Sequence, residues 1–528
     1  MNSVVQPSYS TGDRGQFRLG ASAETGTTRP IVWSIAGSDS GGGAGVQADI
    51  KAFAAFGGVH GCTAVAAITA QNSVAVTRVE AVSADLLDAQ LAALAQDMPP
   101  QAIKTGLLGS AENIHVVCRW VDRLRDMSRA HGQTVALVVD PVLGASTGTG
   151  FADDAMVQAY VDELLPRATL VTPNRAEAQR LGLTIGQPRG SLSVVITGGD
   201  ASPQDGVAAD WFSSPQAHGW LSLPRVNTAH QHGTGCTFAS TAAAALASGY
   251  CVADAVVLAK MATTHALRHA YAAGAGAGPV NAQPGFAQQI ANLPALSPLA
   301  MAEPAAAFLP LQDPALGVYA VVDSAEWVRR VLAAGIRTVQ LRIKDPDDPT
   351  LEAQTQEAIA VANATPGAQL FINDHWALAL RLGAYGVHLG QEDLDTVDLN
   401  ALRQAGVRLG LSTHSYWEVA RAWALRPSYI ACGPVFATQS KDMPWIPQGL
   451  DNLRYWAGLL PVSVVGIAGI DVRNIAELAA QAVASAAVIT AITRAVDPEL
   501  ACRQLMAEFA RGQGLLRGAV PPRARPTL

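Results

Sequence analysis

The sequence has little cysteine, little charge and no long uninterrupted apolar run. Six cysteines in 528 residues, none in a Cys-x-x-Cys pair, exclude a disulfide scaffold and argue against a structural zinc site. Charged residues make up 15% of the chain and the net charge is −7, so a general binder of nucleic acid or anionic membranes is not expected. The longest apolar region, 238–260, is interrupted by Ser240, Ser248 and Asp254, and predicts a buried helix pair rather than a membrane span. These features are typical of a cytoplasmic protein.

Apolar residues, at 49%, suffice for large cores, and the length suggests two large domains or three smaller ones. Residues 1–30 are rich in Ser, Thr and Gly without the apolar stretch of a secretion signal, which predicts a disordered leader. Prolines crowd residues 280–314, so we expect a Pro/Ala-rich linker there, with one short helix near 286–292. The other segments are two α/β blocks and a flexible tail, at 31–279, 315–512 and 513–528.

The first block alternates short apolar runs with helical patterns. This rhythm predicts a mainly parallel sheet with helices on both faces. Buried strands are expected at 31–36, 135–140, 168–172 and 192–197. Each run ends in polar or glycine-rich residues, and an open α/β sheet binds its ligands at such ends.

The second block repeats a strand–helix unit eight times. The expected strands are 317–323, 338–344, 369–374, 386–390, 408–413, 429–436, 462–469 and 486–492. Eight even units in about 200 residues predict a (β/α)8 TIM barrel. An open doubly wound sheet is the alternative, but the even spacing favours closure.

Two glycine-rich segments of the first block indicate phosphate chemistry. The sequence GSDSGGGAG (37–45) follows a strand, where its amides are able to approach a ligand, although a plain tight turn explains it equally well. The sequence HGTGCTF (232–238) opens a long Ala-rich helix, and two glycines at a helix start make an anion hole. Cys236 lies in the first turn, where a thiol pKa tends to fall; the alternative is a small buried cysteine. Asn174 and Glu177 either hold a magnesium–phosphate network or cap the next helix.

The motifs IAGSDSGGGAGVQADIKAF, TAQN, DPV, TPNRAEA and HGTGC, in this order, resemble the hydroxymethylpyrimidine and hydroxymethylpyrimidine-phosphate kinases of the ribokinase-like superfamily. The resemblance covers essentially all of 31–279. It implies that Gly37, Asp49 and Gln71 bind an aminopyrimidine and that ATP is the second substrate. It further implies an anion hole and ATP site made by Gly233, Thr234, Gly235, Asn174 and Glu177, with Cys236 as the catalytic residue.

The sequence departs from these kinases at two phosphate-facing positions. Thr197 stands where relatives usually carry a lysine, and the segment 144–148 (GASTG) lacks the usual Lys-Ser-Gly. Because phosphoryl transfer depends on positioned positive charge, the alternative is a first block that binds the pyrimidine without phosphorylating it efficiently. A pyridoxal-type kinase is a weaker reading, since HGTGC lacks the aspartate expected there.

Polar residues follow the proposed barrel strands at their carboxyl ends, which share one face of a barrel. They are Gln340, Arg342, Lys344, Asn373, Asp374, Asp393, Ser412, Thr438, Ser440 and Lys441. Asp374 and Asp393 are able to share one Mg²⁺ and leave positions for phosphate. Taken singly, each residue is an ordinary solvated side chain, but acids and bases on one rim indicate a site.

The motifs QLRIK, FINDHW, GVHLGQEDL, LGLSTH, ATQSK and GIAGI look like those of thiamine-phosphate synthase, through nearly all of 315–510. The resemblance implies a metal site at Asp374 and Asp393 and a catalytic role for Lys441. It implies that the pyrimidine diphosphate contacts Gln340, Arg342, Lys344, Asn373, Ser412 and Lys441. It places the thiazole phosphate at Thr438, Ser440, Gly469, Ile489 and Thr490. The departures, Ala437, Ala468 and Thr490, conserve size or the hydroxyl.

The reaction implied by these resemblances joins the two blocks. The first phosphorylates an aminopyrimidine alcohol to its diphosphate, and the second replaces the pyrophosphate by the nitrogen of a thiazole phosphate, with Mg²⁺ and lysines stabilising the leaving group. We therefore expect a bifunctional enzyme of thiamine biosynthesis with small-molecule substrates and no nucleic-acid or membrane partner. A homo-oligomer is compatible with the sequence.

Overall fold

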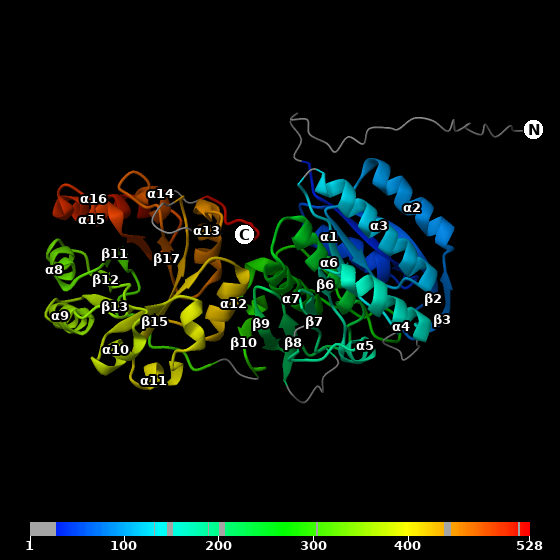
Figure 1. Cartoon of the computed structure of the whole chain (residues 1–528), viewed down its shortest axis with the longest axis horizontal. Helices are drawn as coiled ribbons and strands as arrows, with labels where there is room; N and C mark the ends of the chain where they lie inside the picture. The colour runs from blue at the N-terminus through cyan, green and yellow to red at the C-terminus, as the bar shows by residue number, and fades with distance from the viewer. Residues whose placement is uncertain are drawn as a thin grey trace, which may run out of the picture.

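The computed structural model describes residues 28–130, 132–144, 151–187, 190–199, 206–301, 305–437, 445–515 and 518–528. Two α/β bodies lie side by side along the long axis, and the C-terminus lies at their junction (Figure 1). A ten-stranded sheet forms the N-terminal body, and an eight-stranded closed barrel forms the C-terminal body. The predicted fold class, a ribokinase-like sheet followed by a TIM barrel, is confirmed.

The N-terminal sheet has the strand order β10-β9-β8-β7-β6-β5-β4-β1-β2-β3. Its centre, from β2 to β7, is parallel, and β3 and β8 to β10 add antiparallel edges. The strands are β1 Ile31–Ser38, β2 His60–Gln71, β3 Val76–Ala81, β4 Ala102–Thr105, β5 Ala136–Val139, β6 Leu170–Val171, β7 Ser193–Ile196, β8 Val207–Ser213, β9 His218–Pro224 and β10 Ala295–Ser297.

Alternate residues of this sheet enter two cores. Val32 packs with the side of α6 and α7, whereas Trp33 and Ile35 pack with the side of α2 and α3. Ser83 and Ser110 cap α2 and α3, because each hydroxyl accepts the N–H of the residue three positions later. The helices are α1 Gly45–Phe56, α2 Ala84–Asp97, α3 Ala111–Arg129, α4 Asp154–Ala159, α5 Arg175–Arg180, α6 Thr234–Ala247 and α7 Val252–Arg268, with a π-helix Tyr160–Leu164 and a 3-10 helix Leu165–Arg167.

The barrel closes in sequence order, from β11 to β18 and back to β11. Along β11, Val318, Ala320 and Val322 face the surrounding helices, while Tyr319 and Val321 fill the barrel interior. The strands are β11 Gly317–Val322, β12 Thr338–Leu341, β13 Gln369–Asn373, β14 Gly386–Leu389, β15 Arg408–Thr413, β16 Tyr429–Cys432, β17 Ser463–Ile467 and β18 Ser485–Val488. The helices are α8 Ala325–Ala333, α9 Leu351–Asn363, α10 Trp376–Arg381, the 3-10 helix Glu392–Asp395, α11 Leu399–Gln404, α12 Tyr416–Ala424, α13 Gly449–Leu459, α14 Ile475–Ala479, α15 Thr490–Thr493 and α16 Pro498–Gln513.

The region predicted as a linker, 280–314, is packed structure over its described residues, which corrects that prediction. The expected short helix is two 3-10 turns, Phe286–Gln288 and Ile290–Asn292, and β10 then pairs with β9 of the sheet. Phe286 and Phe308 are buried in the main core. The prolines exclude long elements, as expected, but apolar residues between them still dock the chain.

The predicted flexible tail is also bound to the protein. Residues 518–528 run between the two bodies, where Ala524 is 2% exposed. The guanidinium of Arg523 donates to Phe56 O at 2.6 Å and lies 3.9 Å above the Phe56 ring. On the barrel side, Arg525 N donates to Asn452 Oδ1 at 2.7 Å. The tail therefore contacts both bodies.

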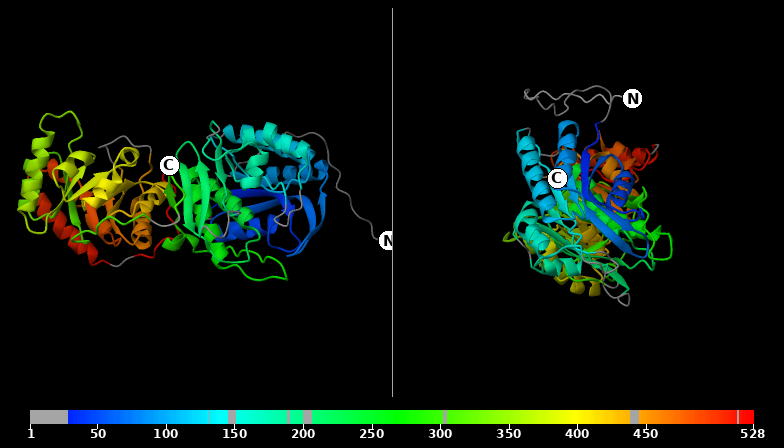
Figure 2. Two further views of the ribbon diagram at one scale, coloured as in Figure 1. Left: turned by 90° about the horizontal axis from the view of Figure 1, so that it is seen from below. Right: turned by 90° about the vertical axis from the view of Figure 1, so that its right-hand side faces the viewer.

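One apolar core continues from the N-terminal body into the barrel through α7, the 280–314 region and α12. Figure 1 shows α12 beside α7 at the junction, and the left view of Figure 2 shows the two bodies meeting along the long axis. The predicted helix pair over 238–260 is α6 and α7. Among the described residues, no helix combines the length and apolarity that crossing a membrane requires.

Candidate active sites

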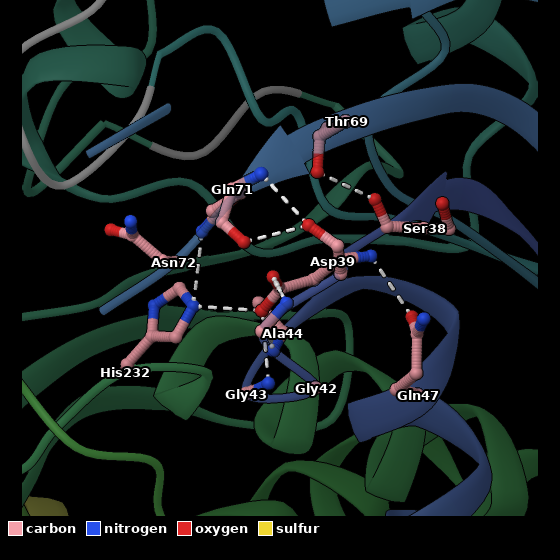
Figure 3. Close-up of polar contacts among 12 residues, drawn as sticks. Ser38, Asp39, Gly42, Gly43, Ala44, Gln47, Thr69, Gln71, Asn72 and His232 are labelled. Atoms are coloured by element: carbon pink, nitrogen blue, oxygen red, sulfur yellow. Dashed lines mark hydrogen bonds and ion pairs between the residues drawn. The ribbon is translucent and has the colours of Figure 1, made fainter. Parts of the chain in front are cut away.

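The glycine-rich loop after β1 wraps around its own carboxylate (Figure 3). Asp39 accepts hydrogen bonds from the backbone N–H groups of Gly41, Gly43 and Ala44 at 2.8–2.9 Å, and His232 Nε2 lies 3.0 Å from its Oδ2. Burial acts to raise the pKa of Asp39, but the hydrogen bonds from His232 and the loop hold it at about 2. Amides that the sequence assigned to a ligand are thus used to fix the loop itself.

The two glycine segments predicted to share a site interlock. A Cβ at Gly43 would lie 2.4 Å from His232 Cδ2, and one at Gly233 would lie 2.0 Å from Gly43 O. Gly233 also has φ of 87°, so only glycine fits without strain at this helix start. Gln71, at the end of β2, completes the group, with its Nε2 3.2 Å from His232 Nε2. Gln71 and the predicted anion hole therefore meet at His232.

Asp49, predicted to bind the pyrimidine, is sealed inside the protein, and the structure does not expose it to a ligand. Its carboxylate accepts from Ser34 Oγ at 2.5 Å, from Ser240 Oγ at 2.7 Å and from Lys104 Nζ at 2.9 and 3.0 Å. Asp49 and Lys104 are both 0% exposed. These partners make it a structural anchor between α1, β4 and α6. Gly37, assigned to the same ligand, is buried in β1, and its carbonyl lies against Gly45.

The expected low thiol pKa of Cys236 is wrong. Burial, with the charges of Asp49 and Asp140 in addition, raises the pKa to about 12, and Lys104 only partly opposes them. Asp140, from the DPV motif, lies under the helix start, since a Cβ at Gly235 would be 3.9 Å from its Oδ2. Burial raises the pKa of Asp140 to about 6 in spite of the opposing charge of Lys104, and its Oδ2 has no hydrogen-bond partner among the described residues.

Asn174 and Glu177 form a capping box at the start of α5, the structural alternative that the sequence left open. Glu177 N donates to Asn174 Oδ1 at 2.9 Å, and Asn174 N donates to Glu177 Oε2 at 3.0 Å. Glu177 Oε1 also accepts from Leu143 N at 3.2 Å. A magnesium role for these two residues stays a prediction.

Two cations that the sequence analysis missed lie behind the Thr197 loop. Lys260 Nζ donates to Asp210 Oδ2 at 2.7 Å, and Asp210 Oδ1 accepts from Gly198 N at 2.8 Å. The guanidinium of Arg225 donates to the carbonyl of Gly199 at 3.1 Å. Asp210 neutralises Lys260, so Arg225 is the cation that contacts the loop directly through its hydrogen bond to Gly199. Four residues of the 144–148 segment, 145–148, lie outside the described residues.

A hydrogen-bonded chain crosses the barrel interior between two predicted substrate residues. Gln340 Nε2 donates to Tyr319 Oη at 3.3 Å, and Tyr319 and Tyr429 hydroxyls are 2.9 Å apart. His388 Nδ1 lies 2.7 Å from Tyr429 Oη, and its Nε2 lies 2.8 Å from Ser412 Oγ. Burial lowers the pKa of His388 to about 4, so the imidazole is neutral and relays one donor and one acceptor.

The two predicted metal ligands lie together on the rim. Asp393 Oδ2 accepts from Gly390 N at 2.7 Å. Burial raises the pKa of both carboxyls; the negative charges of Asp374 and Glu392 add to it at Asp393, while Arg342 opposes it at Asp374. Repelling carboxylates of this kind fit a bound Mg²⁺, which would relieve the repulsion through oxygen ligands. No cluster of three or more His, Cys, Asp or Glu side chains with metal-site geometry occurs in the described residues.

The other predicted rim residues vary in exposure. Asn373 is buried, Arg342 half-buried and Lys344 exposed. Gly469 has φ of 72°, and a Cβ there would lie 2.6 Å from Phe436 Cβ. Ile489 and Thr490 lie at the start of the four-residue helix α15. Thr438, Ser440 and Lys441 lie outside the described residues.

Two family models match the chain, one after the other. The model for phosphomethylpyrimidine kinase matches residues 39–281, and the model for thiamine monophosphate synthase matches residues 318–492. Among curated proteins, the thiamine-phosphate synthase of Serratia proteamaculans (strain 568) is 54% identical over 192 residues, which are 36% of this chain and 90% of that protein. The enzyme of the same name from Escherichia coli (strain SE11) is 53% identical over the same shares.

Solved structures with similarity include two kinases. The Bacillus subtilis pyridoxal kinase in its ADP complex is 29% identical, with a TM-score of 0.43, over 48% of this chain and 98% of that one. The phosphomethylpyrimidine kinase from Clostridium difficile 630 is 29% identical, with a TM-score of 0.37, over 45% of this chain and 100% of that one.

Proposed function

The chain belongs to the phosphomethylpyrimidine kinase family through its N-terminal body and to the thiamine-phosphate synthase family through its barrel, and we propose that it performs two consecutive steps of thiamine biosynthesis. The kinase domain uses ATP to convert 4-amino-5-hydroxymethyl-2-methylpyrimidine and its phosphate to the diphosphate. The synthase domain condenses this diphosphate with thiazole phosphate to thiamine phosphate and pyrophosphate. Each domain is a transferase, and the product of the first is the substrate of the second.

The observation that carries the kinase half is the meeting of Gln71 with the Gly233–Gly235 helix start at His232. An amide side chain suits the ring nitrogens and amino group of an aminopyrimidine. The backbone N–H groups at the start of α6, a 14-residue helix whose N-cap residue Gly233 makes no side-chain capping bond, suit the charge of a transferring phosphoryl group. Recognition and anion stabilisation are therefore adjacent, as phosphorylation of a bound alcohol requires.

The proton of the substrate hydroxyl has two candidate acceptors, Cys236 and Asp140. With a pKa of about 12, Cys236 remains a thiol at neutral pH, whereas Asp140, with a pKa of about 6, is mostly ionised. We assign Asp140 as the base and leave Cys236 as a neutral hydrogen-bonding group beside it. Lys104 lies between Asp49 and Asp140, and its charge opposes the rise in the pKa of the buried Asp140 carboxyl.

In the synthase half, Gln340 and Ser412 bind the pyrimidine diphosphate from opposite ends of the buried chain. The neutral His388 orients the Ser412 hydroxyl and, through Tyr429 and Tyr319, the Gln340 amide. Asp374 and Asp393 would hold Mg²⁺, which supplies charge stabilisation for the departing pyrophosphate. Arg342, Lys344 and Asn373 line the same rim, and Thr438, Ser440, Lys441, Gly469, Ile489 and Thr490 are assigned to the phosphate groups and leaving group by resemblance.

ATP as substrate and Mg²⁺ as metal complete the proposal. The six cysteines are free, in keeping with a reducing cytoplasm. The kinase-impaired binding module is not favoured, since the family model for phosphomethylpyrimidine kinase matches residues 39–281.

Two assays of the full chain, which differ in the pyrimidine substrate supplied, test the proposed function. With the aminopyrimidine alcohol, ATP, Mg²⁺ and thiazole phosphate, we expect thiamine phosphate, detected by fluorescence after oxidation. With the pyrimidine diphosphate supplied directly, the same product is expected without ATP. Product only in the second assay would reject the kinase half, and product in neither would reject both.

A further inference from the structure

The kinase domain contacts the barrel at one end of helix α12, close to the synthase site. The helices α7 and α12 pack together, and α12 directly follows β15, whose carboxyl end carries Ser412. In Figure 1, α12 is the barrel helix that lies nearest to α7 at the junction. A residue at the start of α7 is therefore able to act on the strand end that holds Ser412.

The N-terminus of α12 is capped from the other domain. Ser415 occupies the N-cap position, but its side chain makes no capping hydrogen bond. Trp417 N instead donates to Oδ1 of Asp254, in the first turn of α7, at 2.9 Å. Asp254 is 3% exposed. A carboxylate that accepts from the free amides of a helix start is the usual cap, and here it is 163 residues away in sequence.

A residue in the first turn of α12, Glu418, binds His414, which follows Ser412 by two positions. Glu418, which is 2% exposed, accepts from His414 N at 2.6 Å and lies 2.7 Å from His414 Nδ1. The His414 ring stacks on Trp445, with centroids 3.9 Å apart and planes at 15°. The end of β15 is thus connected to the first turn of α12 by the bonds of Glu418.

Burial of the Asp254 carboxyl costs free energy. Burial, with the charge of Glu418 in addition, raises its pKa to about 7, although the hydrogen bond from Trp417 N opposes the rise. A buried acid beside a second buried acid is unfavourable unless the helix start compensates it. The barrel thus depends on the kinase domain for a group that most helices take from their own N-cap residue.

We propose that Asp254 of the kinase domain is a positioning residue for the synthase reaction: it completes the N-terminus of α12 and thereby fixes the β15–α12 segment that presents Ser412 to the pyrimidine diphosphate. The inference rests on the proposed role of Ser412. Under this proposal the fusion does more than link the two domains, because the synthase site is incomplete without the kinase domain.

Three variants of the full chain test this, with synthase kinetics measured on directly supplied pyrimidine diphosphate. Asp254→Ala removes the cap, and we expect KM for the diphosphate to rise about five- to tenfold, the effect of losing a helix cap, with kcat changed less. Asp254→Asn keeps an acceptor oxygen and should stay within about twofold of wild type. Asp254→Ala combined with Ser415→Asp moves the cap into the barrel and should recover most of the loss.

Arg523→Ala is the matched control, since the Arg523 guanidinium binds Phe56 and Gly57 of the kinase domain at the same junction. It should leave KM unchanged, and kinase turnover should be unchanged in every variant. Equal increases in Asp254→Ala and Arg523→Ala would overturn the proposal in favour of general loosening. An unchanged KM in Asp254→Ala, or no recovery in the double variant, would also overturn it. If the Asp254→Ala protein does not fold, the test rests on folded Asp254→Asn, which keeps the acceptor oxygen. A tenfold rise in its KM would overturn the proposal, and an unchanged KM would support it. Wild-type protein without synthase turnover would instead refute the proposed function.

Discussion

Tyr250 of the kinase domain and Tyr416 of the barrel pack edge to face, with ring centroids 6.2 Å apart, and both bind the tail residue Ala524. The Tyr250 hydroxyl donates to Ala524 O, and Ala524 N donates to Tyr416 Oη at 3.0 Å. All three residues are buried. The last residues of the chain therefore fasten the first domain to the second.

Removal of residues 518–528 should destabilise the whole protein. The deletion loses the two hydrogen bonds of Ala524 and the two between Arg525 and Asn452, at roughly 0.5–1.5 kcal/mol each, so we expect the free energy of unfolding to fall by about 2–6 kcal/mol. Denaturant unfolding followed by fluorescence measures it. Tyr250→Phe, which removes one of these bonds, should cost about 1 kcal/mol. An unfolding midpoint that does not change on truncation would show that the tail is not bound in solution.

The buried pair of Lys104 and Asp49 supports a second prediction, on stability. Lys104→Met leaves Asp49 without its cation, and loss of one partner of a buried pair typically costs about 3–5 kcal/mol. Lys51→Met, at an exposed position of α1, is the control and should change stability by less than about 1 kcal/mol. Adding Asp49→Leu to Lys104→Met should restore part of the loss. A Lys104→Met protein as stable as wild type would contradict the pairing.

The barrel was predictable from the sequence because each of its eight units carries the same strand–helix pattern. Predicted and observed strands differ mainly at their carboxyl ends. The predicted strand 338–344, for example, is Thr338–Leu341 in the structure, because the polar residues after Leu341 belong to the rim. The antiparallel edge, β8 to β10, was not predicted, since no βα rhythm marks it. The closure of 280–314 onto the sheet was missed because proline density indicates broken helices and does not report apolar docking.

The site was predictable where motifs are local and not where partners are distant. Gln71 and the helix start at Gly233 were identified by motif, and both meet at His232. Lys104 gave no signal, because one lysine inside the apolar strand β4 has no pattern that reveals two buried acids nearby. The thiol pKa of Cys236 was misjudged for a similar reason: the helix start favours thiolate, but burial and the charges of Asp49 and Asp140, whose proximity the sequence does not report, outweigh it.

Asp140 and Cys236 can be separated by mutation and pH. Asp140→Asn should lower kinase turnover by about 10²–10⁴-fold, the usual effect of losing a base, while Cys236→Ala should cost less than about tenfold. Because a base must be unprotonated, wild-type turnover should fall as pH drops through about 6 and level off above about 7. Turnover that keeps rising toward pH 10, or a greater loss in Cys236→Ala, would return the role to the thiol.

The two rim carboxylates support a prediction on metal dependence. Asp374→Asn and Asp393→Asn each leave one negative carboxylate where there were two. Because a single carboxylate attracts the cation less, we expect Mg²⁺ to bind more weakly. We expect synthase turnover to fall at least about 100-fold at 1 mM-scale Mg²⁺, with part of it recovered at higher Mg²⁺, and kinase turnover to stay unchanged. Asp395→Asn, an exposed neighbour paired with Arg421, is the control and should behave as wild type. Magnesium titrations of synthase turnover measure the effect, and an unchanged half-saturation in both rim variants would exclude these carboxylates as ligands.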